Sequence, residues 1–265
     1  MKKKTTVLIT NDDGIQADGI RHLWKSQKNH FDATIVAPAF EKSGTGLAIS
    51  LVHPLQIRSF SWEEKIPAWS INGTPADCVK LALSVVLKEK PDIILSGINR
   101  GSNSGRNALY SGTIGGVIEG VLRGIPGIAF SCEDTLSPNF SFWEKYIPTI
   151  VNYFLIHPLP FGTFANITFP KNISNGVKGM KFTRQGKGYY IENPDKRIHP
   201  EGHNYYWLGS RWHTKDIEEE DTDTHLLQHG YITATPLHIS ELTDHAAIES
   251  HKEKFEQLFH HGIKD

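Results

Sequence analysis

Two adjacent carboxylates are the first residues in this 265-residue sequence whose types and spacing suggest chemistry. They are Asp12 and Asp13, in the tetrapeptide Asn11-Asp12-Asp13-Gly14 that directly follows the β-branched run at 5–10. Adjacent carboxylates repel each other and raise one pKa unless a positive charge compensates them. A hard divalent cation supplies that charge and prefers oxygen ligands. The alternative is an Asx-rich turn with a helix cap, where aspartate is common anyway.

Three further segments of small or hydroxyl-bearing residues follow predicted strands or open a predicted helix. Ser43-Gly44-Thr45-Gly46 lets the backbone approach an anion, although such loops are usually plain connections. The segment SGINRGSNSG at 96–105 is rich in backbone donors and amide oxygens, and its Arg100 can meet a phosphate or a carboxylate. The segment 110–113, YSGT, offers free N–H groups at a helix N-terminus, a ready anion site; the alternative is an ordinary Ser/Thr cap.

Short β-rich runs alternate with helical stretches up to about residue 170, which predicts a parallel sheet with crossover helices. Strands are expected at 5–10, 33–37, 55–59, 92–96, 127–131 and 165–169, helices at 20–24, 74–86, 113–122 and 142–156, and a loop at 97–105. In a doubly wound sheet, ligands bind beyond the carboxyl ends of the strands. The four segments are therefore expected to share one site, whose oxygen donors suit Mg²⁺ or Mn²⁺ together with a phosphate.

Composition narrows the function classes. The chain has 28 Lys and Arg against 29 Asp and Glu, so its formal charge of −1 argues against a large nucleic-acid footprint. Cys78 and Cys132 are too few for a disulfide framework or a four-cysteine zinc site, and we expect them in the core of a protein from a reducing compartment. Because no signal-peptide-like stretch and no 18-residue apolar run occurs, the sequence predicts a cytoplasmic protein without a membrane partner.

Residues 171–265 differ in composition from residues 1–170. Aromatic residues gather there among glycine, asparagine and charged residues, at 189–190, 205–207 and 212. A strand is expected at 231–236 and a C-terminal helix at 245–260. Such a long excursion with exposed aromatic residues packs either on a partner subunit or, as a local hairpin, on its own core. The sequence leaves these two alternatives open.

Together, these motifs resemble those of the SurE family, the stationary-phase survival proteins, which are metal-dependent nucleotide phosphatases. The joint occurrence of NDDG and SGINRGSNSG is the most specific part of a resemblance that covers nearly the whole chain. The matching segments are NDDG at 11–14, Ser43-Gly44, NGTPADCV at 72–79, SGINRGSNSG at 96–105, YSGT at 110–113, Glu119-Gly120, and the segments 166–170, 183–186, 221–223 and 230–231. One departure is Gly115-Gly116, where many relatives carry alanines; this pair either frays the first turn of the helix or admits a closer approach of a ligand.

The resemblance implies an α/β fold, with a Rossmann-like, doubly wound and mostly parallel sheet. It implies a nucleotidase core at 1–170 and, at 171–265, a hairpin-and-helix excursion of the same domain that is exchanged between subunits of a homodimer or homotetramer. It implies hydrolysis of nucleoside 5′- and 3′-monophosphates and, in some members, of short-chain polyphosphate. One Mg²⁺ or Mn²⁺ per subunit, replaceable by Ca²⁺, is implied without any other cofactor. Its ligands map onto Asp12, Asp13, Ser43 and Asn99.

The mechanism expected from this set is metal-assisted hydrolysis of a phosphomonoester, which requires no covalent nucleophile. The residues expected to hold the phosphate are Gly44, Ser111, Gly112 and Thr113. Asp13 is expected to orient the attacking water. His245 is a candidate general acid if the C-terminal segment returns to the site, and otherwise a surface histidine at the start of a helix.

Three other function classes share part of this pattern. A haloacid-dehalogenase-type phosphatase needs an Asp-x-Asp spacing, whereas the two aspartates here are adjacent. A serine hydrolase needs a G-x-S-x-G elbow, and the chain contains no such pentapeptide. A non-catalytic nucleotide sensor could use the same loops. Such a sensor would bind nucleotide with metal without releasing phosphate, so phosphate release distinguishes the enzyme from the sensor.

Overall fold

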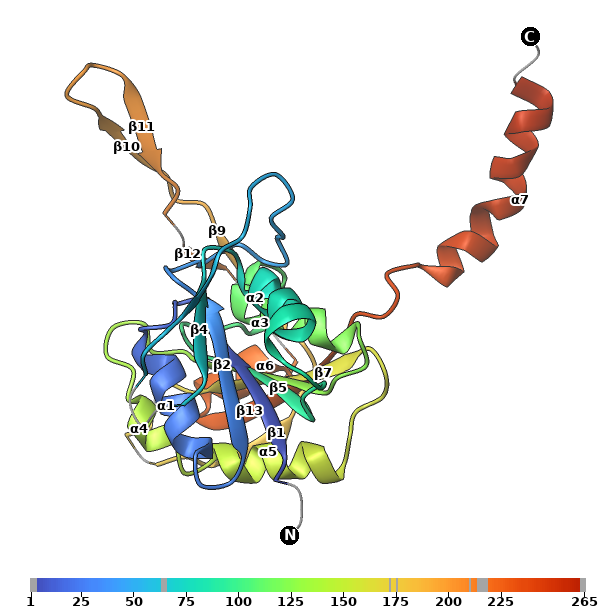
Figure 1. Cartoon of the computed structure of the whole chain (residues 1–265). Helices are drawn as coiled ribbons and strands as arrows, with labels where there is room; N and C mark the ends of the chain where they lie inside the picture. Colours follow the sequence, from blue (N-terminus) through green and yellow to red (C-terminus); the bar gives the residue numbers. More distant parts are fainter. Residues whose placement is uncertain are drawn as a thin grey trace.

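A nine-stranded sheet forms the centre of the computed structural model, which describes residues 4–262 apart from 63–65, 172, 175, 210 and 214–218. Among these described residues the strand order is β3-β4-β2-β1-β5-β6-β7-β13-β8 (Figure 1). The strands are β1 (Thr6–Thr10), β2 (Asp32–Pro38), β3 (Ile57–Ser59), β4 (Ala68–Ile71), β5 (Ile93–Arg100), β6 (Gly127–Cys132), β7 (Thr163–Phe169), β8 (Gly179–Phe182) and β13 (Tyr231–His238). Neighbours run parallel except β3 beside β4 and β13 beside β7, so the predicted mostly parallel α/β sheet is confirmed.

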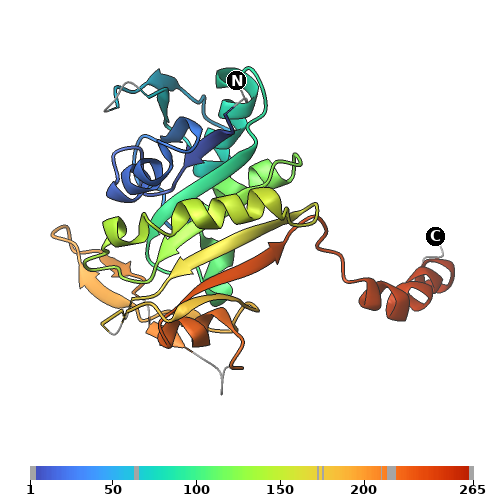
Figure 2. The ribbon, with the colours of Figure 1, turned by 90° about the horizontal axis from the view of Figure 1, so that it is seen from below.

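Helices cover both faces of this sheet, as expected for a doubly wound fold (Figures 1 and 2). On one face lie α1 (Asp18–Gln27), α4 (Phe140–Trp143) and α5 (Ile147–Ile156). On the other lie α2 (Pro75–Leu81), which continues into a π-helical turn at Ala82–Val86, and α3 (Gly112–Val121). Successive residues of β1 serve both layers, because side chains alternate along a strand: Val7 and Ile9 face the first, Leu8 the second.

The winding direction of the chain reverses at β1. This strand lies between β2 and β5 and is parallel to both. From β1 the chain reaches β2 through α1, and from β4 it returns through α2 to β5 on the other side of β1. The loops after β1 and β5 therefore flank the reversal point, where open α/β sheets bind ligands.

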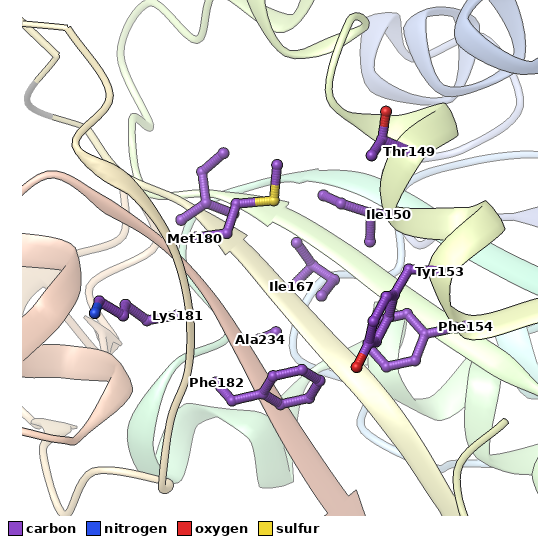
Figure 3. Close-up of a pocket in the computed structure, with 10 residues that line it drawn as sticks. Thr149, Ile150, Tyr153, Phe154, Ile167, Met180, Lys181, Phe182 and Ala234 are labelled. Atoms are coloured by element: carbon purple, nitrogen blue, oxygen red, sulfur yellow. The ribbon is translucent and has the colours of Figure 1, made fainter. Parts of the chain in front are cut away.

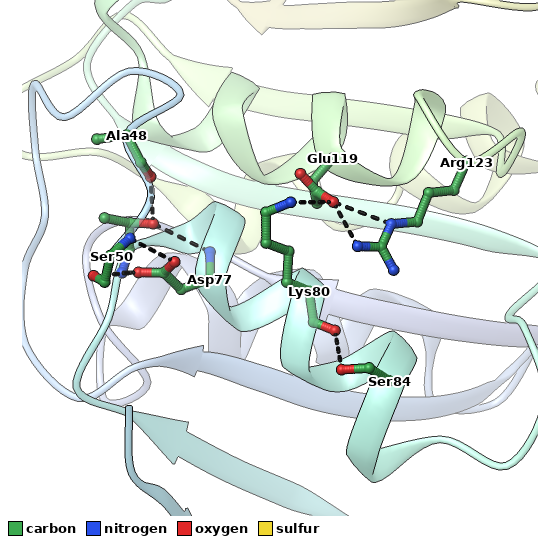
Figure 4. A network of polar contacts seen from close by, with 8 residues as sticks. Ala48, Ser50, Asp77, Lys80, Ser84, Glu119 and Arg123 are labelled. Atoms are coloured by element: carbon green, nitrogen blue, oxygen red, sulfur yellow. Dashed lines mark hydrogen bonds and ion pairs between the residues drawn. The ribbon is translucent and has the colours of Figure 1, made fainter. Parts of the chain in front are cut away.

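A capping network at the start of α2 holds the loop that leads into β3 (Figure 4). Thr74 and Asp77 form a reciprocal capping box, as the Thr74-Pro75 pair predicts. Asp77 also accepts hydrogen bonds from the amide and the hydroxyl of Ser50, at 3.0 and 2.7 Å, and the Thr74 hydroxyl donates to Ala48 O at 2.7 Å. The cap therefore anchors the loop after Ser43 as well as the helix.

An ion-pair cluster joins α2 to α3 (Figure 4). The buried Glu119 of α3 lies 2.9 Å from Lys80 Nζ and 2.9 Å from a guanidinium nitrogen of Arg123. Two cations around one buried carboxylate supply the pairing that a buried charge needs. The cluster fixes the position of α3, whose N-terminus belongs to the candidate site.

Residues 171–265 contribute strands to the main sheet and also form elements outside it. Strands β8 and β13 belong to the main sheet, and α6 (Asp223–Gln228) packs on β13. The remaining strands are β9 (Tyr189–Ile191) with β12 (Arg211–His213), and β10 (Asp195–Ile198) with β11 (Asn204–Trp207). The β10–β11 hairpin and α7 (His245–Gly262) project from the body (Figures 1 and 2). None of the helices in the described part of the chain has the length and apolarity to cross a bilayer.

Two elements differ from the sequence prediction. The expected loop at 97–105 is shorter, because β5 continues to Arg100: a register shift between Ser96 and Asn99 preserves the pairing with β6 beyond the irregularity. The helix expected at 142–156 is split into α4 and α5, and Pro148 lies in the first turn of α5. Proline lacks the N–H that a continuous helix would require there, whereas it fits a first turn.

We predict that Asp77→Asn lowers the free energy of unfolding by about 1.5–3 kcal/mol, the usual worth of hydrogen bonds to a charged group. Burial alone would raise the pKa of Asp77, but the bonds from Ser50 and Thr74 outweigh it and hold the pKa below the usual 3.8. The stabilisation is therefore complete above pH 3.8 and is lost as the pH falls through the lower pKa of the folded state.

Urea unfolding at a series of pH values measures this difference. Ser84→Ala is the matched control, because Ser84 lies on the helical extension of α2 and donates only to Lys80 O, at an exposed position. A loss for Asp77→Asn no larger than for Ser84→Ala, or one that is independent of pH, would contradict the anchoring role.

Candidate functional site

Asp12 is the buried centre of the candidate site, with 3 % of its surface exposed. The Thr113 hydroxyl of α3 donates to its Oδ1 at 2.5 Å, and the Lys42 amide donates to its main-chain carbonyl at 2.7 Å. Burial, supported by repulsion from Asp13, raises the pKa of Asp12 to about 6 despite the bond from Thr113. The loop after β1 is thereby joined to the loop after β2 and to α3.

Asp13 lies beside Asp12 and is only partly buried. Its Oδ2 accepts a hydrogen bond from the Arg100 amide at the end of β5, at 3.2 Å. Burial raises the pKa of Asp13, the bond from Arg100 opposes that change, and the negative charge of Glu41 adds to it. Two carboxylates whose ionised forms are both disfavoured create the demand for positive charge that the sequence predicts.

Ser43 and Asn99 complete the predicted donor set. The Ser43 hydroxyl donates to Glu41 Oε1 at 2.7 Å. Both residues lie in the loop after β2, which is bonded to Asp12 through the Lys42 amide. The Asn99 amide nitrogen donates to Gly101 O at 2.9 Å, so its carboxamide oxygen is the atom left to act as a ligand. The structure thus places Asp12 and Asp13 on the loop after β1, Ser43 on the loop after β2, and Asn99 at the end of strand β5, just before Arg100. The loop after β1 is hydrogen-bonded both to the loop after β2 and to the end of β5, at the reversal point of the sheet.

The donor chemistry of this set fits a hard divalent cation. Two carboxylates, a hydroxyl and an amide oxygen are the ligands that Mg²⁺ and Mn²⁺ accept. Burial is the main cause of the raised pKa values of both Asp12 and Asp13. A bound cation would remove both the repulsion and part of the cost of burial.

The N-terminus of α3 lies directly against Asp12. Ser111 is its N-cap, and the Ser111 hydroxyl accepts from the Ile114 amide at 3.1 Å. The helix leaves the amides of Gly112 and Thr113 without intrahelical partners, as every helix start does. Thr113 differs from the expectation in one respect: its hydroxyl hydrogen is committed to Asp12, so only its amide remains for an anion.

Close packing explains the glycines at this helix start. A Cβ on Gly112 would lie 2.8 Å from Asp12 Cβ, and one on Gly115 would lie 2.3 Å from the carbonyl oxygen of Gly46. The Gly46 amide in turn donates to Tyr110 O at 3.0 Å. The close neighbour of Gly115 is the backbone of the loop after Ser43, and the closer approach of a ligand stays a prediction. Gly44 has no such neighbour, but its φ of +73° favours glycine.

His245 is the one predicted site residue that the structure does not bring to these loops. It is exposed at the start of α7, which projects from the body, and its Nε2 lies 3.1 Å from Glu241 Oε1 (Figures 1 and 2). Within one chain, His245 is therefore a surface histidine paired with a neighbour on its own segment. A general-acid role would need α7 of a second copy.

Among the described residues, a polar pocket adjoins the site and an apolar pocket lies elsewhere on the sheet. The polar pocket, of about 440 Å³, is lined by Asp13, Glu41 and Arg100 and by residues of α1 and α4. The apolar pocket, of about 270 Å³, lies between α5 and strands β7, β8 and β13 and is lined by side chains such as Tyr153, Met180 and Phe182 (Figure 3). The apolar pocket is not built from the site loops, so we assign the chemistry to the polar one.

Sequence reasoning assigned no role to two carboxylates that organise the site, although the segment 221–223 contributes to the family resemblance. Glu41 accepts from the Ser43 hydroxyl and adds negative charge beside Asp13. Asp223, which is 1 % exposed, accepts from the amides of Gly105 and Gly186 at 3.0 and 2.7 Å and so holds the segment that leads into α3. The position of Glu41 two residues before Ser43 was a usable signal; nothing local to Asp223 indicates a partner 118 residues away.

The fold and the candidate site together define a doubly wound α/β protein with clustered oxygen donors and a helix N-terminus at the reversal point of its sheet. Residues 7–192 match the family model described as "Survival protein SurE". The chain is 50% identical to "5'-nucleotidase SurE" of Protochlamydia amoebophila over 97% of this chain and 98% of that protein. It is 42% identical to the protein of the same name from Christiangramia forsetii, over 100% of this chain and 96% of that one.

A solved structure agrees with these relatives. The crystal structure of the SurE protein from Aquifex aeolicus superposes with a TM-score of 0.81 at 37% identity, covering 94% of this chain and 99% of that chain. The chain belongs to the SurE family.

We predict that Gly115→Ala destabilises the protein, although alanine is the better helix former by about 1 kcal/mol. The added Cβ meets backbone at 2.3 Å, and overpacking of this kind costs about 1–3 kcal/mol. Gly120→Ala is the comparator in the same helix, because its Cβ would meet only the end of the Ile94 side chain. Thermal unfolding of both variants measures the difference; a Gly115→Ala protein at least as stable as the parent would refute the contact.

Proposed function

We propose that this chain is a metal-dependent phosphomonoesterase that hydrolyses nucleoside 5′- and 3′-monophosphates to nucleoside and phosphate. One observation carries the proposal: the buried carboxylate of Asp12 is hydrogen-bonded to Thr113, in the first turn of α3. A group that attracts cations is thus in direct contact with a helix N-terminus, which attracts anions. A cation at the aspartates and a phosphate at the helix N-terminus would therefore be neighbours. The relatives named 5'-nucleotidase support the substrate class.

Asp12, Asp13, Ser43 and Asn99 are the residues that would hold one Mg²⁺ or Mn²⁺ per subunit. When bound, such an ion neutralises charge on the phosphoryl oxygens and lowers the pKa of a bound water. The Thr113 hydroxyl and the Arg100 amide keep the two carboxylates oriented for this task. Phosphoryl transfer depends mainly on positioning, to which this hydrogen-bonded frame contributes, and on charge neutralisation, which the bound ion would supply.

The phosphate is assigned to the start of α3. The amides of Gly112 and Thr113 donate to its oxygens, and the Ser111 hydroxyl, which accepts from Ile114, retains its own hydrogen for a further bond. The Gly44 amide, in the loop that lies against Tyr110, is the remaining donor of the proposal. The helix dipole favours the negative charge at this end.

Asp13 is the residue assigned to orient the attacking water. It is more exposed than Asp12, its Oδ2 accepts from Arg100, and it lines the polar pocket. The nucleoside is assigned to the same pocket, whose volume of about 440 Å³ suits a small ligand and whose wall includes Phe140.

A second copy of this chain is the partner that the proposal requires. The exposed side chains of Ile248, Phe255 and Leu258 lie on α7, which projects from the body. An isolated helix of this kind gains little stability in water unless it packs on another surface. We assign α7 to a homodimer or homotetramer, in which His245 of one copy could reach the site of another; light scattering of the intact chain measures the oligomeric state. The buried free thiols of Cys78 and Cys132 suit the reducing cytoplasm.

We predict that Asp12→Asn lowers kcat by about 100-fold or more, because the site loses a charged ligand. Without added metal, the variant should unfold at the same temperature as the parent protein or higher, since burial already disfavours the charge of Asp12. Asp32→Asn is the matched control, an exposed aspartate at the opposite end of the neighbouring strand β2. Turnover by a folded Asp12→Asn protein at the parent rate would exclude this metal site.

The proposed reaction itself is tested by phosphate release from a panel of nucleoside 5′- and 3′-monophosphates and tripolyphosphate. We expect release from the monophosphates, its loss in EDTA, and recovery with Mn²⁺ or Mg²⁺ in excess of the chelator. Polyphosphate cleavage is the further activity that the panel measures. Nucleotide binding without phosphate release, in the presence of either metal, would assign the chain to the sensor class.

A further inference from the structure

The tip of the projecting hairpin carries a group of metal-ligating side chains far along the chain from the site loops. It comprises residues 199–203, His199-Pro200-Glu201-Gly202-His203, between β10 and β11 (Figure 1). The His199 amide donates to His203 O at 2.9 Å, and the Gly202 amide donates to His199 O at 2.8 Å. Because Ile198 also pairs with Asn204, the backbone fixes the two histidines opposite each other at the end of the hairpin.

The side chains of this tip converge. The imidazole rings of His199 and His203 stack with their centroids 4.4 Å apart and an angle of 15° between their planes. His199 Nδ1 lies 3.8 Å from Glu201 Oε2. One ligand atom from each of the three residues lies within 4.8 Å of the other two. In the part of the chain that the structure describes, no other three His, Cys, Asp or Glu side chains meet this criterion.

We propose that His199, Glu201 and His203 form a second metal site, which binds a borderline transition-metal ion such as Zn²⁺ and leaves one coordination position to water. Two imidazoles and one carboxylate are a ligand set of zinc, whereas Mg²⁺ prefers oxygen ligands alone. The site therefore differs in chemistry from the all-oxygen set around Asp12.

Binding of Zn²⁺ at this site requires only a small rearrangement of the three side chains. Zinc–nitrogen bonds of about 2.0–2.1 Å place tetrahedral ligand atoms roughly 3.3–3.5 Å apart. The three side chains are exposed, so rotation about their χ angles can close the difference without moving a packed core.

A second histidine pair in the same protein shows what the proposed site has in addition. His225 of α6 and His229, which follows that helix, stack at 4.3 Å, but the pair belongs to no three-ligand group in the described residues. One ring nitrogen of each pair is bonded to the backbone: His229 Nδ1 to His225 O, and His199 Nδ1, which accepts from the Glu201 amide at 3.3 Å. Stacking alone is thus not the basis of the proposal. The pair supplies a control in which two histidines are removed from elsewhere in the chain.

Calorimetric titration of the intact chain with Zn²⁺, in millimolar Mg²⁺ to occupy any hard-ion site, tests the proposal. We expect His199→Ala/His203→Ala to bind one equivalent of Zn²⁺ fewer than the parent protein. His225→Ala/His229→Ala should retain that equivalent, and Glu201→Gln should weaken its binding by about tenfold or more, the usual scale for a lost metal contact. Circular dichroism checks that each variant folds.

Two results would overturn the proposal: an unchanged number and affinity of Zn²⁺ equivalents in His199→Ala/His203→Ala, or an equal loss in both double variants. Neither result depends on turnover. A failure here is therefore distinct from a failure of the phosphatase, which the Asp12 variant tests.

Discussion

The juxtaposition of two carboxylates at the reversal point of the sheet is the constraint on which the rest of the site depends. Burial opposes the ionisation of both Asp12 and Asp13, and the negative charge of Asp13 adds to this effect at Asp12. The hydrogen bonds from the Thr113 hydroxyl and the Arg100 amide orient the two carboxylates and offset only part of this effect. Such an arrangement costs stability in the free protein and gains it when a cation binds. The charged centre and its fixed neighbours are the arrangement expected of a site built for function rather than for stability.

The second constraint is the short distance between the start of α3 and the loops beside it, which glycine residues make possible. The start of α3 approaches Asp12 and the Gly46 loop so closely that a Cβ at Gly112 or Gly115 has no room. The helix N-terminus can therefore share a ligand with the aspartates only because these positions lack side chains. The Lys80–Glu119–Arg123 cluster and the Asp77 cap hold the helix and the loop in that position from outside the site. Helix packing, loop anchoring and the placement of the carboxylates therefore all determine how closely the start of α3 approaches Asp12.

The sequence predicts those parts of the structure whose signals are local. Alternating β-rich and helical segments indicate the sheet, Thr74-Pro75 marks the start of α2, and NDDG after a strand indicates the site. What it does not predict depends on pairing across the chain: the continuation of β5 to Arg100 rests on contacts with β6 beyond an irregularity. The same holds for Asp223, whose partner Gly105 is 118 residues away.

Anomalous diffraction from crystals of this protein soaked with Mn²⁺ and inorganic phosphate tests the central claim most directly. The account predicts one strong manganese peak among Asp12, Asp13, Ser43 and Asn99, with the phosphate between that peak and the amides of Gly112 and Thr113. Manganese bound elsewhere with this position empty, or phosphate bound away from the start of α3, would contradict it.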